Sequence, residues 1–423
     1  YTFVPFIENP VLRQALNNIP GNIQLLTQET HPPPMVKSIA LLCLVVLFSQ
    51  CSNKETVVDP YAAIKAKFPT TINATSLADY TGQGRPTYIT KDNTGTNSIS
   101  NAGATLGRVL FYDKNLSSSN TIACASCHKQ SSAFSDTPVQ SQGVNGVTGR
   151  HAMRLVNSRF STETKFFWDE RAATLEAQTT RPIQDHKEMG FSGADGDQNL
   201  AALITKLQSI DYYNELFTLA YGNNTITEAR MQNAMAQFVR SIQSFDSKYD
   251  VGRATAPNDG APFSNFSTLE NQGKALFLAP PVFDANSIRI SGGAGCQGCH
   301  QAPEFDIAPN SGNNGVVGIA GGTGTDFTNT RSPSLRNILN GSGAPNGPFM
   351  HDGSKPTVES VIEHYNKIVL VPGNNLIDPK LTPGGKPQQL NLTQNEKDAL
   401  VAFLKTLTGS NVYTDARWSD PFK

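Results

Sequence analysis

The sequence predicts a mostly α-helical protein built from two similar domains, with its helices joined by long loops. Apolar residues recur at helical spacing, whereas the alternation typical of half-buried strands is nearly absent. A short motif returns after about 170 residues, the pattern of a duplicated domain. The 423 residues include 34 glycines and 26 prolines, which interrupt helices and favour loops.

The charge balance excludes some classes of function. The chain has 34 Lys and Arg against 35 Asp and Glu, a net charge of −1. A general nucleic-acid-binding protein shows a basic excess, and a disordered polyanion shows a large acidic one. We therefore expect a folded protein with no nucleic-acid partner.

Residues 35–50 have the pattern of a secretory signal peptide, with a methionine and a lysine ahead of an apolar run from Ile39 to Phe48. As a helix this run spans only ~15 Å, half of a bilayer core, so a permanent membrane-spanning helix is not expected. Residues 1–34 precede the apparent start, and we interpret them as an upstream segment absent from the mature protein.

Cys51 ends this run and resembles the lipid-modified cysteine of bacterial lipoproteins. The resemblance implies acylation of Cys51 and a lipid-anchored protein on the periplasmic side of the cell envelope. Gln50 departs from the small residues expected before such a cysteine, so an ordinary signal peptide with a chance cysteine is the alternative. Residues 51–84 are polar and rich in turns, and we expect a tether there.

An internal repeat divides the rest of the chain. The similar segments Leu106–Phe111 and Gln272–Phe277 each begin a predicted helical stretch, and a Cys-x-x-Cys-His unit starts 17 or 23 residues after their glycines. We therefore predict one domain over residues 85–250 and a second over residues 264–423. The Gly- and Pro-rich residues 250–265 are the expected linker.

Two further helices are predicted from apolar spacing. One covers Thr227 to Tyr249. The other follows the capping box of Thr393 and Glu396 and ends near Gly409. Their apolar faces contain Met231, Met235, Phe238, Ile242 and Phe245 in the first helix, and Leu400, Phe403, Leu404 and Leu407 in the second.

The two Cys-x-x-Cys-His units predict two covalently bound haem c groups. Two thiols at this spacing form thioethers with the two vinyl groups of one haem, and the adjacent histidine ligates the iron. A zinc site or a dithiol redox pair is the alternative, but two such units in an exported, duplicated chain favour two cytochrome-c-like domains. The residues are Cys124, Cys127 and His128, and Cys296, Cys299 and His300.

Longer motifs resemble the bacterial dihaem cytochrome c peroxidase and MauG family from about residue 103 to residue 408. The resemblance implies that peroxide reacts at the first-domain haem, which makes that domain peroxidatic. It also implies that electrons enter at the second-domain haem. The matching motifs are Gly107–Ser117, Ala133–Asp136, Phe167–Gln178, Pro182–Gly190, Arg331–Asn337 and Phe349–Gly353.

The resemblance implies catalytic roles for Trp168, Gln178 and Glu188. Trp168 would relay electrons between the haems. The carboxylate of Glu188 would move a proton from the near to the leaving oxygen of peroxide, while the amide of Gln178 orients the substrate. The alternatives are a buried core aromatic for Trp168 and surface polar groups for the other two.

The first site departs from the pattern at Val144, which replaces the histidine that blocks the resting iron in members needing reductive activation. His151 and Met153 lie nearby in sequence and are alternative ligands, but we expect them to pack or to form hydrogen bonds. His151 also replaces the asparagine of a calcium site found between the domains in many members. Calcium therefore stays an open prediction, with carbonyls from near Asn346 and Pro348.

The second departure is Tyr365, which stands where the peroxidases have a methionine ligand to the second haem and where MauG has a tyrosine. A phenolate favours Fe(III), whereas methionine favours Fe(II). We predict Tyr365 as the sixth ligand, with Met350 or His364 as alternatives.

These features together predict a peroxidase that reduces hydrogen peroxide to water with electrons from a small cytochrome c or cupredoxin. A MauG-like oxidase that modifies a partner protein is the alternative enzyme, and a dihaem electron carrier is the non-enzymatic alternative. The resemblance also allows a homodimer.

Overall fold

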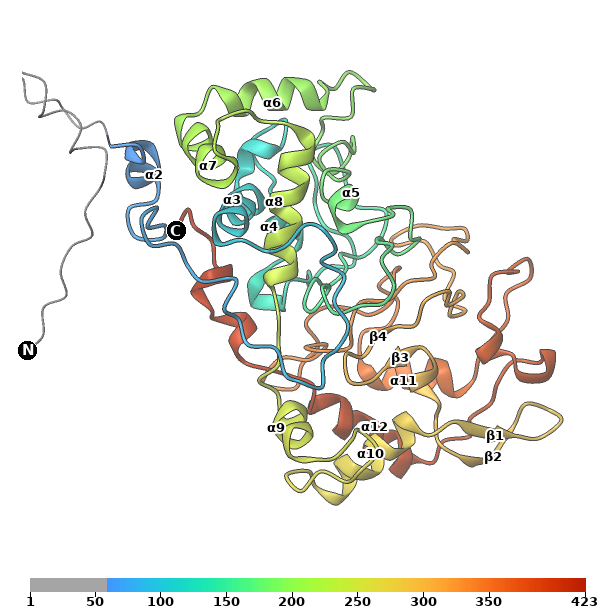
Figure 1. Cartoon of the computed structure of the whole chain (residues 1–423). Coiled ribbons are helices and arrows are strands. Elements are labelled where there is room, and N and C mark those ends of the chain that lie inside the picture. Colours follow the sequence, from blue (N-terminus) through green and yellow to red (C-terminus); the bar gives the residue numbers. More distant parts are fainter. Residues whose placement is uncertain (1–58) are drawn as a thin grey trace, which may run out of the picture. The chain divides into compact units, whose positions relative to one another are not determined.

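The computed structural model describes residues 59–423, which form one compact unit. The predicted upstream segment, the signal peptide and Cys51 lie outside the described residues. Helices joined by long loops dominate, so the predicted fold class is confirmed (Figure 1). In the described part of the chain, no helix is both long and apolar enough to cross a membrane.

The regular elements are short. The α-helices are α2 Ala62–Lys67, α3 Asn101–Tyr112, α4 Cys124–Cys127, α5 Leu175–Thr179, α6 Leu200–Gln208, α7 Asp211–Tyr221, α8 Glu228–Ser241, α9 Lys248–Thr255, α10 Thr268–Leu278, α11 Val358–Asn366 and α12 Gln394–Lys405. Two antiparallel two-stranded sheets pair β1 Pro281–Phe283 with β2 Arg289–Gly292, and β3 His300–Gln301 with β4 Asp306–Ile307.

The internal repeat appears as two equivalent helix pairs, α3 with α8 and α10 with α12 (Figure 1). A glycine lies at each crossing. A Cβ atom on Gly107 would clash with the backbone of Ala234, and one on Gly273 would clash with the backbone of Ala399. Both helix pairs therefore depend on a close approach that only glycine permits, which explains why the repeated motif contains it.

The helix starts follow their caps. The side chain of Ser100 caps α3, and Ser267 with Glu270 forms a capping box at α10, so both helices begin before the repeated motif. The capping box predicted from Thr393 and Glu396 is present at the start of α12. That helix ends at Lys405, before the predicted stop at Gly409.

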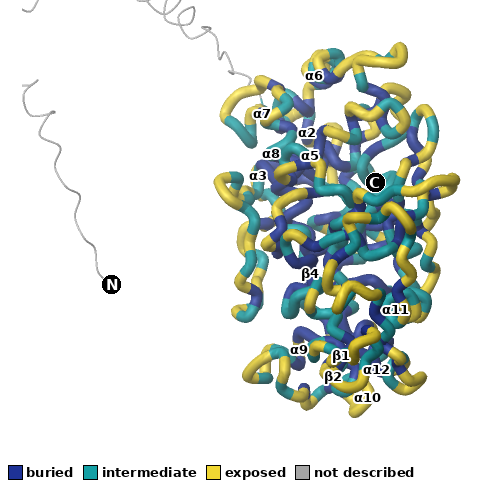
Figure 2. Tube along the Cα trace, turned by 90° about the vertical axis from the view of Figure 1, so that its right-hand side faces the viewer, coloured by how far each residue is buried: buried dark blue, intermediate teal, exposed yellow. Residues whose placement is uncertain are grey.

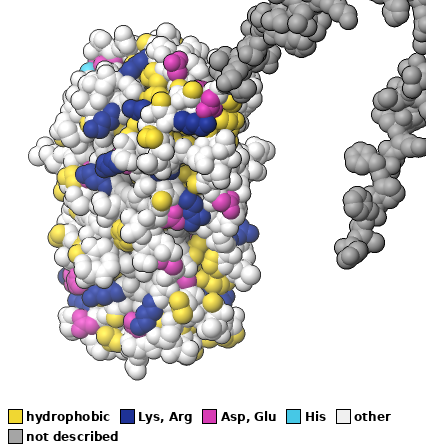
Figure 3. All heavy atoms as spheres, turned by 90° about the vertical axis from the view of Figure 1, so that its left-hand side faces the viewer, with side chains coloured by type: hydrophobic (Ala, Val, Ile, Leu, Met, Phe, Trp, Pro, Cys, Tyr) yellow, Lys and Arg dark blue, Asp and Glu magenta, His cyan; other side chains and the backbone are white. Residues whose placement is uncertain are grey.

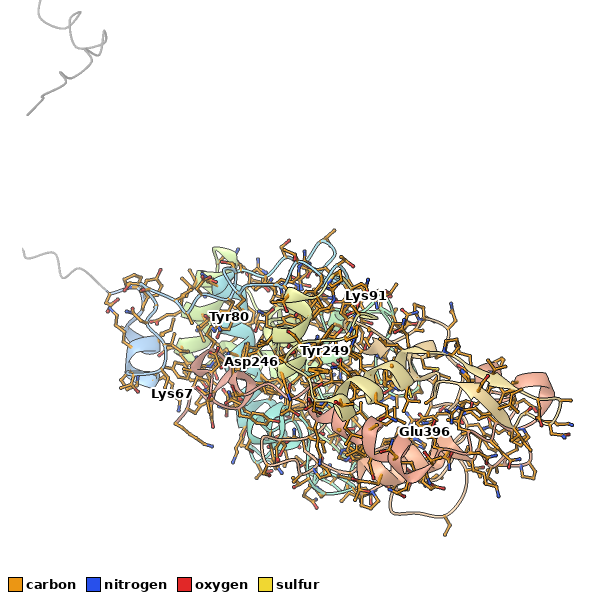
Figure 4. The ribbon with its side chains drawn as sticks, turned by 90° about the horizontal axis from the view of Figure 1, so that it is seen from below. Lys67, Tyr80, Lys91, Asp246, Tyr249 and Glu396 are labelled. Atoms are coloured by element: carbon orange, nitrogen blue, oxygen red, sulfur yellow. The ribbon has the colours of Figure 1, made fainter. Side chains whose placement is uncertain are left out.

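The helix predicted from Thr227 to Tyr249 is split, and this prediction is wrong beyond Ser241. Asn157 binds the backbone of Ser244 on both sides: its amide donates to the Ser244 carbonyl at 3.1 Å, and its oxygen accepts the Ser244 N–H at 2.8 Å. A new capping box then starts α9 at Ser247. Asp246 and Tyr249, labelled in Figure 4, flank this second start.

Residues 250–255 of the predicted linker belong to α9. The carboxylate of Asp250 in this helix receives two 2.9 Å contacts from the buried guanidinium of Arg336, and the Tyr88 hydroxyl donates to it at 2.8 Å. This buried ion pair joins distant parts of the chain, so these residues are a packed element. The domain limits near residues 250 and 264 stay predictions.

Residues 59–84 pack onto the protein, so the predicted tether is wrong for this described part. Ile64 and Phe68 of the α2 region are fully buried against the core that α3, α7 and α8 share. The chain end returns to the same side, because Tyr112 donates its hydroxyl to the carbonyl of Trp418 at 2.6 Å. Figure 2 shows the buried segments inside a rim of exposed loops.

The surface carries both signs of charge. On the face drawn in Figure 3, Lys and Arg side chains are interspersed with Asp and Glu. This pattern agrees with the net charge of −1 over the whole chain.

We expect Gly107→Ala to lower the free energy of unfolding by about 1–3 kcal/mol, because overpacking forces the helices apart. Urea unfolding followed by circular dichroism measures the change. Gly84→Ala is the matched control, since a Cβ atom there meets nothing within 4 Å. Equal stability of the two variants would contradict the proposed role of this crossing.

Candidate functional site

The first Cys-x-x-Cys-His unit lies on α4 and its C-terminal cap. His128 Nδ1 lies 3.2 Å from the carbonyl oxygen of Phe134, to which a protonated Nδ1 donates. Phe134 presents this carbonyl from the left-handed backbone region, at a φ of 58°. Such a bond fixes the imidazole ring and leaves Nε2 free to ligate a metal, as in many proximal histidines.

The four thiols are not paired in disulfides. Burial raises the pKa of Cys124 to about 12 and that of Cys127 to about 11. Burial also raises the pKa of Cys296 to about 12 and raises that of Cys299. A dithiol redox pair needs a lowered thiol pKa. The environment therefore fits thioether attachment better than thiol redox chemistry.

Glu188 lies close to the first unit, because its charge contributes to the raised pKa of both thiols there. Burial raises the pKa of Glu188 itself to about 7, the nearby Asp185 carboxylate adds to this rise, and the Arg171 guanidinium opposes it. A carboxyl group with this pKa can both accept and release a proton near neutral pH.

Gln178 is partly buried on α5, whose N-terminus is capped by Thr174. In the described part of the chain, its side-chain amide has no hydrogen-bond partner, and it is therefore available to a ligand. The chain from Gln178 to Glu188 forms consecutive turns, with the Gln184 N–H bonded to the Thr180 carbonyl at 3.2 Å.

The loop that carries Val144 packs directly on the Glu188 segment. The Val144 N–H donates to the Glu188 carbonyl at 3.0 Å, and a Cβ atom on Gly190 would meet the Val144 side chain. Position 144 is therefore beside Glu188. The residue there is an aliphatic side chain, which cannot ligate a metal.

His151 is buried and already engaged. Its Nδ1 lies 3.1 Å from the Pro138 carbonyl, and its Nε2 lies 3.5 Å from the Ser135 hydroxyl.

Near the predicted calcium ligands, the Asn346 amide donates to the carbonyl of Asn337 at 2.8 Å. Met153 lines a cavity of the second half of the chain. Calcium between the halves stays a prediction.

The second unit opens into a cavity of about 520 Å³. Cys296, Cys299 and His300 line it, together with a mainly apolar wall. Burial lowers the pKa of His300 to about 4, which keeps its imidazole neutral and able to ligate a metal. Two thiols, a neutral imidazole and a large apolar cavity fit a covalently held haem. Apolar members of the wall include Phe277, Leu278, Ile338, Leu390, Leu400 and Leu404.

Two of the three predicted sixth ligands reach this cavity. Tyr365 and Met350 line it, and both contact the side-chain amide of Asn314, at 3.1 Å to the Tyr365 hydroxyl and 3.3 Å to the Met350 sulfur. His364 does not line it, and its Nε2 lies 2.9 Å from the Asn314 carbonyl. The geometry therefore favours Tyr365 or Met350. No motif marked Asn314 in the sequence.

Trp168 lines the wall of the same cavity. Its indole N–H donates to the His151 carbonyl at 2.8 Å, and its ring centre lies 6.3 Å from that of His351. Its own carbonyl accepts the N–H groups of Thr330 at 2.9 Å and Arg331 at 3.1 Å. The indole is therefore fixed where the two halves of the chain meet.

Residues 101–255 match the family model described as di-haem cytochrome c peroxidase. The methylamine utilization protein MauG of Methylophilus methylotrophus is 31% identical over 324 residues, which cover 74% of this chain and 84% of that protein. The cytochrome c551 peroxidase of Nitrosomonas europaea is 29% identical over 320 residues, covering 72% and 80%.

Solved structures agree. A MauG-like protein associated with microbial copper homeostasis has a TM-score of 0.62 and 29% identity, covering 81% of this chain and 99% of that chain. The diheme peroxidase BthA of Burkholderia thailandensis has a TM-score of 0.53 and 21% identity, covering 81% and 92%, and supports the fold alone.

We expect Glu188 to make unfolding pH-dependent. Its folded pKa of about 7 is above its usual value of 4.5, so it contributes stability that is fully present below 4.5 and is lost as the pH rises through 7. Urea unfolding measured below and above this pH range should show that the free energy of unfolding changes less with pH in Glu188→Gln than in the parent. Glu359→Gln, at an exposed position of α11, should behave like the parent.

Proposed function

Because the chain belongs to the di-haem cytochrome c peroxidase and MauG family, with haem c as its cofactor, we propose that it is a peroxidase that reduces hydrogen peroxide to water. Its first unit, Cys124 to His128, holds the haem at which peroxide reacts. The observation that carries this proposal is the partly buried Glu188, with a pKa of about 7, beside that unit.

The two bound haems supply the redox-active iron, and the reaction consumes two electrons and two protons for each peroxide to give two water molecules. Glu188 as carboxylate accepts the proton of the near peroxide oxygen and, once protonated, donates it to the leaving oxygen. The Gln178 amide donates a hydrogen bond that orients the peroxide. Val144 leaves the approach open without prior reduction.

Electrons enter at the second unit from a small cytochrome c or cupredoxin and pass to the first site by way of Trp168. The three hydrogen bonds that hold Trp168 between the halves support this path. We place the protein on the periplasmic side of the envelope, anchored by lipid on Cys51, with calcium and a homodimer as further parts of the proposal.

A second candidate function rests on Tyr365. This residue reaches the second cavity, and MauG of Methylophilus methylotrophus is among the similar proteins. A phenolate ligand favours oxidised iron and suits a MauG-like oxidase that modifies a partner protein. The first-site residues serve either reaction, so the second site distinguishes the two candidates.

Steady-state peroxide consumption by the purified holoprotein, with a reduced small cytochrome c as donor, tests the proposal. We expect turnover without reductive pre-incubation, and Glu188→Gln should slow it by about 10²–10⁴-fold. Haem content should stay at two per chain. Glu359→Gln is the control. A parent protein with two haems and no turnover would instead support the oxidase or an electron carrier.

Tyr365→Met should raise the reduction potential of the second haem and shift its spectrum towards His/Met ligation, because a soft thioether favours Fe(II). Redox titration followed by optical spectroscopy measures both effects. Met350→Leu is the matched variant and should leave the spectrum unchanged. The reverse pattern would assign the ligand to Met350.

A further inference from the structure

Three cationic side chains line the cavity of the second unit: Arg154, Arg331 and Lys380. Two of them have a carboxylate nearby. The Lys380 ammonium lies 3.3 Å from Asp378, and the Arg331 guanidinium lies 3.9 Å from Asp306. Arg154 forms no ion pair with any carboxylate of residues 59–423.

The guanidinium of Arg154 is held in place by backbone groups. Its Nε donates to the Arg336 carbonyl at 3.1 Å, and its Nη2 donates to the Ser334 carbonyl at 3.1 Å. Its Nη1 has no acceptor within the described residues. Arg154 is therefore fixed on the cavity wall, and its Nη1 group can still donate a hydrogen bond.

Arg154 remains a cation at neutral pH. Burial lowers its pKa to about 10, and the nearby Tyr413 opposes this. Burial lowers the pKa of His151, and the charge of Arg154 lowers it further. Neither neighbour supplies a negative charge, and a buried cation without one is costly. An anionic partner is therefore missing from the protein itself.

A haem carries two propionate carboxylates on the edge away from the vinyl groups that form thioethers. Lys380 lies beside the attachment unit, because a Cβ atom on Gly298 would meet its side chain and its charge lowers the pKa of Cys299. Arg154 lies with Trp168 on the wall contributed by the first half of the chain. The propionates are the anions that the proposed haem would bring into this cavity, and Arg154 on its wall has no carboxylate partner among residues 59–423.

We propose that Arg154 forms an ion pair with a propionate carboxylate of the haem held by Cys296, Cys299 and His300. The inference rests on the proposed attachment of that haem. An Arg–carboxylate pair is a strong, directional contact, and here it would use the donor that the protein leaves free. The pair would hold one propionate at the cavity wall to which Arg154 and Trp168 both contribute.

The test is a redox titration of each haem in the holoprotein across the neutral pH range. In the parent, the paired propionate stays ionised and the potential of the second haem is nearly independent of pH. In Arg154→Gln the propionate is buried without a cation, and its pKa rises by about 3 units towards neutrality. The potential of the second haem should then match the parent at low pH and fall below it as the pH rises.

Two variants act as controls. Arg154→Lys keeps the charge and should restore a potential independent of pH. Arg159→Gln removes an arginine that already pairs with Asp92 and does not line the cavity, and should leave both haems unchanged. A purely structural role of Arg154 would lower thermal stability in both Arg154 variants without a pH-dependent potential, which would overturn the proposal.

Haem content separates this inference from the proposed function. Fewer than two haems per chain, by pyridine haemochrome, would reject the attachment on which both rest. Two haems with an unchanged potential in Arg154→Gln would reject the ion pair alone. If that variant does not fold, redox-difference infrared spectra of the parent decide, since a protonated propionate band of the second haem at neutral pH contradicts the pairing.

Discussion

Three hydrogen bonds to the backbone fix Trp168, and they tie together the two halves of the chain that carry the candidate sites. The indole N–H binds the His151 carbonyl, and the Trp168 carbonyl binds the N–H groups of Thr330 and Arg331. Beside it, Arg150 contacts Asp169 at 2.7 Å and Asp326 at 2.8 Å. A side chain held from both halves is a rigid part of their interface, so the electron path that we propose through Trp168 would have one defined geometry.

The two halves share one arrangement of helices but place different side chains around their attachment units. Each has a helix pair that crosses at a glycine, Gly107 or Gly273, and each places a Cys-x-x-Cys-His unit after that helix. The first unit has the partly buried carboxyl group of Glu188 beside it, whose pKa burial raises to about 7. The second has an apolar cavity with Tyr365 and Met350 on its wall. The two halves therefore share this helix packing, while the side chains around their two units differ.

The sequence predicted helices and attachment units where their physical cause lies within a few residues. The capping box at Thr393, the helical spacing and the attachment units all act within a few residues. Long-range contacts explain where the predicted helix limits were wrong. Helix α8 ends early because Asn157, far away in sequence, forms two hydrogen bonds with the backbone of Ser244. Arg154 was missed for the same reason, since its acceptors are backbone carbonyls some 180 residues away that leave no sequence signal. The roles assigned to Gln178 and Glu188 stay predictions.

The two candidate ligands of the second site, Tyr365 and Met350, share one hydrogen-bond donor, the side-chain amide of Asn314. Its side-chain nitrogen lies within reach of both the Tyr365 hydroxyl and the Met350 sulfur. An amide N–H binds an anionic oxygen more strongly than a thioether sulfur, which is a weak acceptor. Burial raises the pKa of Tyr365, and the Asn314 hydrogen bond opposes that rise. Asn314 therefore offsets part of the cost of a buried phenolate at Tyr365, and this contact supports the predicted ligation of the second site by Tyr365.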